Sequence, residues 1–346
     1  MNLSSQDVER CVLVPPSLPA SLRAAGVRSA REIWDFNGTT MGTHWIARVV
    51  ECSALSRDDA EALIHDALAT VVRLMSPWER DSDLGRYRIA QANTWVRFCN
   101  ATFTVLRRAL EVAALTHGAY DPTIGRLTDA LGFGPSDPAH AVQPESDAAE
   151  RARSYTGYLR VQIDPASSAV YQPGGFELDL CSIAKGYAVD LAIDRLAAAG
   201  VDSTFIEIGG EARGVGCKPD GQPWWCQIEP PSQAGAGYPV TVAAVCGVAL
   251  ATSGNALRKR MLPSGELGHI VNPLPGSVLP EGIESVTVLA PSCMEADAFA
   301  TALYLLGPEE GIRLADSRDL AALFVARLPD GGYKERWSRR FSAYLA

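Results

Sequence analysis

A carboxylate and a hydroxyl lie one helical turn apart near the end of the chain, and both are hard oxygen ligands. Asp297 and Thr301 are four residues apart in a mostly apolar segment, and the helix predicted over 294–306 places them on one face. Mg²⁺ takes few protein oxygens of this kind and completes its shell with water and phosphate oxygens. The alternative is an aspartate that serves the helix dipole beside a packed threonine.

A second polar group surrounds the start of another predicted helix. Asp179 lies in the strand predicted over 176–181, Ser182 begins the helix predicted over 182–199, and Lys185 lies one turn further on. Free N–H groups and the positive dipole at a helix N-terminus favour an anion, so this segment could hold a phosphate or a metal ion. An ordinary N-cap followed by a solvated lysine is the alternative.

Three more side chains have types that suit contact with a ligand. His269 precedes an apolar pair in the strand predicted over 269–271 and is either a base or a packed structural histidine. Trp78 and Tyr120 lie in predicted loops beside small residues, where an aromatic ring either stacks on a flat ligand or belongs to the core. The glycine-rich segment 209–216 lacks the GxGxxG spacing and is followed by no helix, which argues against a dinucleotide-binding loop.

The elements that would position these residues mix helices and strands without a regular βαβ alternation. Ser56, with Asp59 three residues later, caps a predicted helix that ends at Ser76 and Pro77, and a further helix is predicted over 102–117. Further strands are predicted over 204–208, 240–245, 285–289 and 320–326. The expected fold class is α+β, with mixed or antiparallel sheets and flanking helices.

Length and composition limit the classes of protein to consider. The chain has 346 residues and a net charge of −9, which makes nucleic acid an improbable partner. Hydrophobic residues make up 47% of the chain and charged residues 21%, so it can bury a sizeable core. The longest apolar run, residues 242–251, is half of the about 20 residues that a membrane-spanning helix needs. We therefore expect no membrane segment.

The N-terminal residues do not read as a signal peptide. Asp7 and Glu9 replace the usual basic segment, and Pro15 and Pro16 interrupt the apolar stretch, so we expect a cytoplasmic protein. Its eight cysteines contain no CxxC pair and are expected to be reduced, mostly buried thiols. Residues 1–33 are expected to be an extension of uncertain order, followed by one composite domain over 34–346.

Although each signal is weak alone, their order along the chain resembles the successive motifs of the ApbE family, whose members are FAD:protein FMN transferases. The motifs are Met41-Gly42-Thr43, the segments 118–123 and 179–190, Gly209-Gly210-Glu211, Ala251-Thr252-Ser253-Gly254, the segment 269–273 and the segment 296–303. They extend over about residues 36–345. The resemblance implies an ApbE-like fold and a Mg²⁺-dependent enzyme, with Mn²⁺ as the alternative metal.

The implied reaction transfers the FMN portion of FAD to a Ser or Thr hydroxyl of a partner flavoprotein and releases AMP. By position, the resemblance assigns Ser182, Asp297 and Thr301 to the metal, with Ser182 acting through its side chain or its carbonyl. It makes His269 the base for the acceptor hydroxyl, and Lys185 a catalytic cation that stabilises negative charge in the transition state. The residues expected to contact FAD are Met41, Trp78, Ala119, Tyr120, Asp121, Asp179, Lys185 and Ile270.

Two alternatives remain open at this point. An FAD pyrophosphatase would use the same metal group with water as nucleophile, and a flavin carrier would bind FAD without turnover. The sequence also departs from the family pattern, since Cys181 and Ser182 stand where many relatives have two glycines and Asn272 stands where Asp is common. Many relatives are exported or lipid-anchored, whereas the N-terminus here favours a cytoplasmic acceptor.

Overall fold

The computed structural model describes residues 11–16, 30–231, 234, 238–254, 259–262, 265–274 and 282–345. The chain divides into two compact units. Unit 1 comprises residues 1–69, 185–254 and 282–346, and unit 2 comprises residues 70–184 and 255–281. Helix α2 (Arg57–Met75) continues from the first unit into the second.

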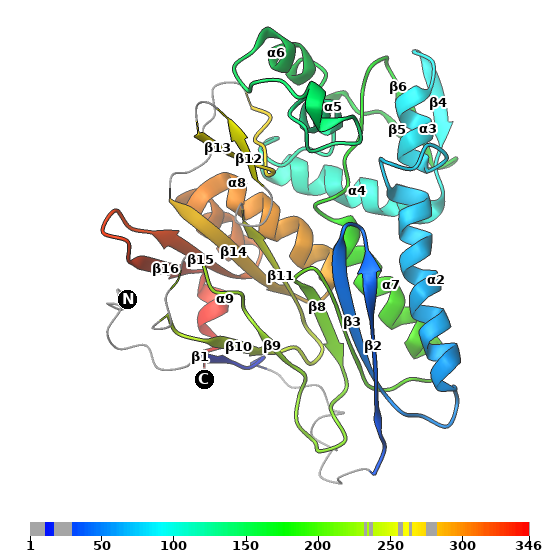
Figure 1. Ribbon diagram of the computed structural model, residues 1–346, viewed down its shortest axis with the longest axis vertical. Coiled ribbons are helices and arrows are strands. Elements are labelled where there is room, and N and C mark those ends of the chain that lie inside the picture. Colours follow the sequence, from blue (N-terminus) through cyan, green and yellow to red (C-terminus); the bar gives the residue numbers. More distant parts are fainter. Residues whose placement is uncertain are drawn as a thin grey trace. The chain divides into compact units, whose positions relative to one another are not determined.

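An eight-stranded sheet forms the centre of unit 1 (Figure 1), and all its neighbouring strands are antiparallel. The strand order is β16-β15-β14-β11-β8-β7-β3-β2. In chain order the strands are β2 (Ile33–Thr40), β3 (Thr43–Val50), β7 (Thr204–Ile208), β8 (Glu211–Val215), β11 (Ala249–Gly254), β14 (Ile283–Ala290), β15 (Ala321–Arg327) and β16 (Tyr333–Trp337).

Two helices of unit 1 carry predicted site residues. Helix α7 (Ala184–Ala198) belongs to this unit from Lys185 onward, and α8 (Cys293–Ser317) packs on β11 and β14 (Figure 1). Within α8, Gly307 has the non-helical angles φ 78° and ψ 173° and is followed by Pro308, so the helix is broken where the sequence predicted its end. A short helix, α9 (Arg339–Ser342), lies near the C-terminus.

A three-stranded sheet of unit 1 includes part of the expected N-terminal extension. Strand β1 (Cys11–Leu13) pairs in parallel with β10 (Thr241–Ala244), which pairs with β9 (Trp225–Gln227). Leu13 is fully buried in an apolar cluster that also contains Trp224. Residues 1–10 and 17–29 lie outside the described residues, so their order stays a prediction.

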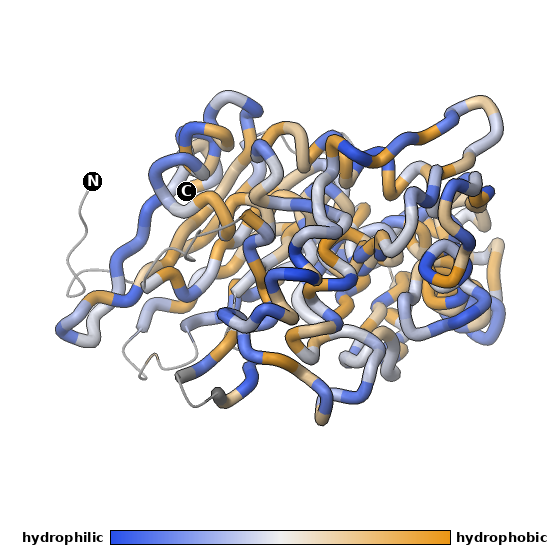
Figure 2. The backbone as a smooth tube through the Cα atoms, turned by 90° about the horizontal axis from the view of Figure 1, so that it is seen from above, coloured by the Kyte–Doolittle hydropathy of each residue, from blue (hydrophilic) through white to orange (hydrophobic). Residues whose placement is uncertain are grey.

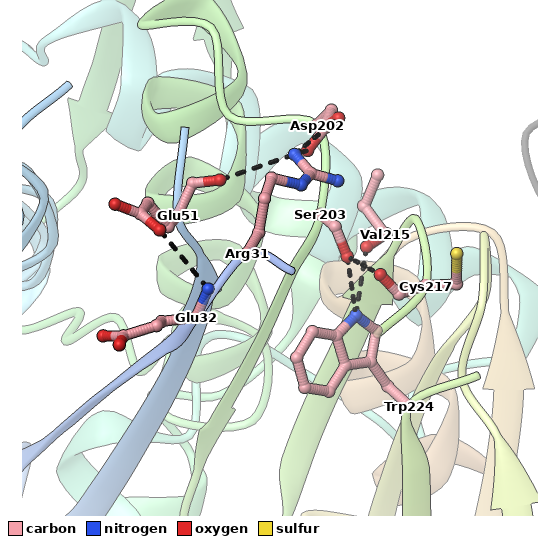
Figure 3. A network of polar contacts seen from close by, with 8 residues as sticks. All are labelled: Arg31, Glu32, Glu51, Asp202, Ser203, Val215, Cys217 and Trp224. Atoms are coloured by element: carbon pink, nitrogen blue, oxygen red, sulfur yellow. Dashed lines mark hydrogen bonds and ion pairs between the residues drawn. The ribbon is translucent and has the colours of Figure 1, made fainter. Parts of the chain in front are cut away.

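Polar contacts fix the backbone where the chain enters β2 (Figure 3). Arg31 forms an ion pair with Asp202 at 2.9 Å, and the N–H of Glu32 donates to the carboxylate of Glu51 at 3.4 Å. In the same view Trp224 Nε1 donates to Ser203 Oγ at 3.3 Å, which allows the indole to be buried with its N–H satisfied.

Unit 2 is built from short elements. Its helices are α3 (Asp83–Ile89), α4 (Asn100–Leu115), α5 (Gly125–Ala130), η1 (Pro138–His140), α6 (Asp147–Arg153) and η2 (Tyr158–Arg160). Its strands are β4 (Thr94–Arg97), β5 (Ile163–Asp164), β6 (Ala169–Gln172), β12 (Lys259–Leu262) and β13 (Gly265–Gly268). They form the antiparallel sheets β4-β6-β5 and β12-β13.

The α+β prediction is confirmed, but the strand predicted over 176–181 is wrong. Phe176, Leu178 and Leu180 are buried alternately, as the pattern indicates. The backbone groups bond elsewhere, because Asp179 N–H donates to the carbonyl of Pro122 and the carbonyl of Glu177 accepts from Gly125 N–H. The segment is therefore extended chain with one isolated bridge and no strand ladder.

The strand predicted over 269–271 is also wrong. Strand β13 ends at Gly268, and the following residues turn. The side chain of Asn272 accepts the N–H of Leu274 at 2.9 Å, and Pro273 has no N–H to give to a neighbouring strand. His269 is therefore on a loop.

Apolar and hydrophilic stretches alternate along the backbone (Figure 2), as expected when each element buries one face. In the part of the chain that the structure describes, no helix is both long and apolar enough to cross a membrane.

Candidate active site

The predicted site residues lie in both compact units, and each group is described by itself. Unit 1 holds Met41, Lys185, Asp297 and Thr301. Unit 2 holds Trp78, Ala119, Tyr120, Asp121, Asp179, Ser182, His269 and Ile270.

Asp297 is a buried carboxylate one turn into α8. Its Oδ2 accepts the backbone N–H of Gly186, from the first turn of α7, at 2.9 Å. A Cβ atom at Gly186 would lie only 2.2 Å from the carbonyl oxygen of Cys293, so this close approach of α7 to α8 requires glycine. Burial raises the pKa of Asp297, while the charge of Lys185 and the Gly186 hydrogen bond act in the opposite direction.

A hydroxyl group on α8 lies beside a hydroxyl group on the neighbouring strand β11. Thr301 is four residues beyond Asp297 on α8, and its Oγ1 is 2.9 Å from Ser253 Oγ on β11. Ser253 was part of a recognised motif, but the sequence assigned it no role. The two adjacent hydroxyl residues Thr252 and Ser253 near the end of strand 249–254 were the signal that pointed to it. The structure thus places a second hydroxyl oxygen, that of Ser253, beside the predicted hydroxyl of Thr301 in unit 1.

Glu211 is another buried carboxylate of unit 1, and sequence reasoning missed its role. It begins β8 directly after the two-residue turn Gly209-Gly210, and its Oε2 is 2.5 Å from Lys185 Nζ. Burial raises the pKa of Glu211, partly offset by Lys185. Burial alone would lower the pKa of Lys185, but the charges of Glu211 and Asp297 raise it, so the lysine stays protonated.

The charges and ligand types of this group fit Mg²⁺. One ammonium group, that of Lys185, interacts with the two buried carboxylates of Asp297 and Glu211, so a further cation would lower the cost of burying them. Among the described residues, no cluster of three or more His, Cys, Asp or Glu side chains suits a metal ion. A site with one carboxylate and hydroxyl oxygens is instead typical of Mg²⁺ completed by water and phosphate.

Cys293 lies at the start of α8 beside these acidic groups. Its pKa is raised well above the usual value by burial, with Asp190 and Glu211 adding to the effect. Because a thiol must ionise to act as a nucleophile, this raised pKa argues against such a role for Cys293.

In unit 2, Asp121 uses its carboxylate to shape its own loop. Oδ1 accepts from the N–H and the hydroxyl of Thr123 at 2.8 and 2.6 Å, and Oδ2 accepts from the N–H of Tyr158 at 2.9 Å. Burial raises the pKa of Asp121, and these hydrogen bonds lower it. Ala119 and Tyr120, its neighbours, are also buried. These contacts explain why the sequence needs Asp121 there, whether or not it also contacts FAD.

Ser182 and Asp179 are tied to the same unit. Ser182 lies in a turn just before α7, and its Oγ donates to the phenolic oxygen of Tyr120 at 3.1 Å. Asp179 accepts the N–H of Cys181 at 2.8 Å and the hydroxyl of Thr128 at 3.2 Å. The predicted role of Ser182 as a metal ligand stays a prediction, because its partner ligands belong to the other unit.

A pocket in unit 2 brings Trp78 and Asp179 together. Trp78 belongs to its lining and is 52% exposed. Its lining residues are Pro77, Trp78, Leu84, Arg88, Gly125, Thr128, Phe133, Gly134, Pro135, Glu177, Leu178 and Asp179. An exposed indole, apolar walls and a few polar groups are features of a site for a flat heteroaromatic ligand.

The remaining predicted residues lie at the ends of hairpins. Met41 and Gly42 form the turn between β2 and β3, with φ angles of 49° and 73°. His269 follows β13 and is partly exposed, whereas Ile270 is buried. The role of His269 as the base for the acceptor hydroxyl stays a prediction.

Comparisons with known proteins agree with this arrangement of motifs. The protein-family model described as "ApbE family" matches residues 41–324 of this chain. A protein named FAD:protein FMN transferase from Vibrio cholerae is 31% identical over 339 residues, which cover 95% of this chain and 98% of the relative. One with the same name from Escherichia coli K12 is 27% identical and covers 91% of this chain and 90% of its own.

Solved structures show the same similarity. The apo form of the flavinyl transferase ApbE of Pseudomonas stutzeri has a TM-score of 0.82 and 29% identity, covering 91% of this chain and 97% of that protein. The flavin transferase ApbE of Vibrio cholerae has a TM-score of 0.80 and 30% identity, covering 91% and 100% of the two chains.

Proposed function

The chain belongs to the ApbE family, and we propose that it acts as an FAD:protein FMN transferase, the activity that names its relatives. The observation within the chain that best supports the proposal is the buried Asp297 one helical turn from Thr301, in a group whose charge suits a divalent cation. Neither a carrier nor a simple flavin store needs such a group.

The proposed reaction is a phosphoryl transfer to a Ser or Thr hydroxyl of a target flavoprotein. The hydroxyl oxygen forms a bond to the phosphorus of the FMN portion, and the bond from that phosphorus to the bridging oxygen breaks. AMP leaves with the bridging oxygen, and His269 accepts the proton of the hydroxyl.

We assign the metal to Asp297 and Thr301, with Ser182 as the third ligand predicted from the sequence. When bound, Mg²⁺ neutralises charge that develops on the phosphate oxygens. Gly186 N–H holds Oδ2 of Asp297, which orients the carboxylate. Lys185 contributes a positive charge beside Asp297, although its ammonium is already paired with Glu211.

We also propose that a ring of FAD stacks on Trp78 in the unit 2 pocket. Replacing Trp78 with alanine should raise the KM for FAD about tenfold and leave kcat within about twofold, because stacking on an aromatic side chain contributes about 1–3 kcal/mol. The matched control is Trp95→Ala, which removes an indole that is 51% exposed and lies on β4, outside the lining of the pocket. An equal KM effect in both variants would contradict the assignment.

The function is tested by incubating the purified protein with FAD and Mg²⁺, with and without a candidate flavoprotein acceptor. Flavin fluorescence that stays on the acceptor in a denaturing gel supports the transferase. Free FMN and AMP with no labelled acceptor would indicate an FAD pyrophosphatase, and unchanged FAD would indicate a carrier. The dependence on Mg²⁺, with Mn²⁺ as the alternative, is measured in the same assay after treatment with a chelator.

The acceptor protein and the cellular location stay predictions from the sequence. We propose a flavoprotein with an accessible Ser or Thr as the partner and the cytoplasm as the location.

A further inference from the structure

Asp190 of α7 closes the N-terminus of α8. Its Oδ1 accepts the N–H of Cys293 at 3.0 Å and its Oδ2 accepts the N–H of Met294 at 2.9 Å. Ser292 Oγ accepts the next N–H, that of Glu295, at 3.3 Å. The first N–H groups of a helix have no partner within the helix, so Asp190 satisfies two groups that would otherwise be buried without one. Its negative charge also interacts favourably with the helix dipole.

Two ion pairs fix α7 on β8. In one the helix supplies the cation, and in the other the strand supplies it. Lys185 Nζ is 2.5 Å from Glu211 Oε2, and Arg213 Nη1 is 2.7 Å from Asp190 Oδ1. Glu211 and Arg213 are two residues apart on one face of β8, a rise of about 6.8 Å. Lys185 and Asp190 are five residues apart on α7, a rise of about 7.5 Å. The spacings match, and any large slide of the helix along the strand would separate both pairs.

Helix α7 therefore holds α8 at two points. Asp190 binds the first two N–H groups of α8, and Gly186 N–H binds the carboxylate of Asp297 one turn further along. Gly186 and Asp190 are themselves one turn apart on α7, so a single face of that helix makes both contacts. A change at Asp190 would loosen the end of α8 that carries Asp297.

We infer that Asp190, held by Arg213, is a positioning residue that fixes α8 so that the oxygens of Asp297 and Thr301 are presented to the metal. Neither Asp190 nor Arg213 is itself assigned as a ligand. The inference rests on the metal group proposed above, and its test measures metal binding without turnover.

The test titrates the full-length protein with Mn²⁺ in the absence of FAD and follows free Mn²⁺ by electron paramagnetic resonance. Asp190→Asn should weaken Mn²⁺ binding by about 10-fold to 100-fold, the usual effect of removing a group that orients a metal ligand. The matched control is Asp194→Asn, one turn further along α7. Asp194 also lies 4.0 Å from Arg213, but it is 73% exposed, so its variant should bind Mn²⁺ as the wild type does.

Arg213→Gln is the second variant. It leaves the carboxylate of Asp190 on the N-terminus of α8 and removes its tether to β8, together with the longer contact of Arg213 with the exposed Asp194. It should therefore also weaken Mn²⁺ binding, and it decides the question if Asp190→Asn does not fold. Wild-type affinity in the folded variants would overturn the inference. Absence of Mn²⁺ binding in the wild type would instead contradict the proposed metal group, and with it this role of Asp190.

Discussion

Replacing Asp297 with asparagine should abolish metal-dependent FMN transfer, lowering kcat on the order of a thousandfold. The estimate follows from the several kcal/mol that a metal ion contributes to stabilising charge in a transition state, at about 1.4 kcal/mol per factor of ten in rate. Asparagine keeps the shape of the side chain and still accepts the N–H of Gly186, which Asp297 accepts at 2.9 Å. The negative charge is lost, and an NH₂ donor replaces the second carboxylate oxygen.

The variant should also remain folded. Because burial raises the pKa of Asp297, its charge is held at a cost, and the neutral amide removes part of that cost. We expect a Tm equal to or above that of the wild type, with transfer measured by flavin fluorescence on the acceptor. Glu309→Gln on the same helix is the control, since that carboxylate is exposed and pairs only with Arg336 among the contacts described. Transfer by Asp297→Asn at the wild-type rate would disprove the metal assignment.

The metal group shows which relations a sequence can predict. Asp297 and Thr301 are linked by local periodicity, and the structure places both on α8 as the spacing of four requires. Ser253 is 48 residues from Thr301 in the chain, and Glu211 comes from a different element than Lys185, so only the tertiary fold brings Ser253 beside Thr301 and Glu211 beside Lys185. No local pattern contains such pairings.

The wrong strand over 176–181 has a related cause. The alternation of Phe176, Leu178 and Leu180 correctly predicts which side chains are buried. Whether such a segment is a strand depends on where its backbone N–H and C=O groups bond, and here they bond to the loop at Pro122 and to the start of α5 at Gly125. The side-chain pattern carries no information about those partners.

The ion-pair partner of Lys185 is also not predicted by its position in the sequence. The sequence treats it as a free cation for an anionic substrate, whereas the structure pairs it with Glu211. In a chain with a net charge of −9, a neutralised lysine adds little attraction for FAD, itself an anion. In the proposed function, attraction of the pyrophosphate would therefore depend more strongly on the metal ion, which increases the effect expected for Asp297→Asn.

Replacing His269 with alanine should slow transfer to the acceptor by about 10²-fold to 10⁴-fold, the usual contribution of a general base. The KM for FAD should change less than about twofold, because the pocket residues Trp78 and Asp179 remain in place. Rates with saturating FAD and acceptor, and FAD binding by fluorescence, measure the two effects separately.

His140→Ala is the control, since it removes an exposed imidazole from η1 of the same unit. If His269→Ala loses FAD binding and transfer together, His269 is a binding residue and not the base. If His269→Ala transfers FMN at the wild-type rate, the acceptor hydroxyl loses its proton to another group. The pattern that supports the proposal is slow transfer with normal FAD binding and partial recovery of transfer on addition of imidazole, because an added base can replace a missing proton acceptor but not a missing contact with the flavin.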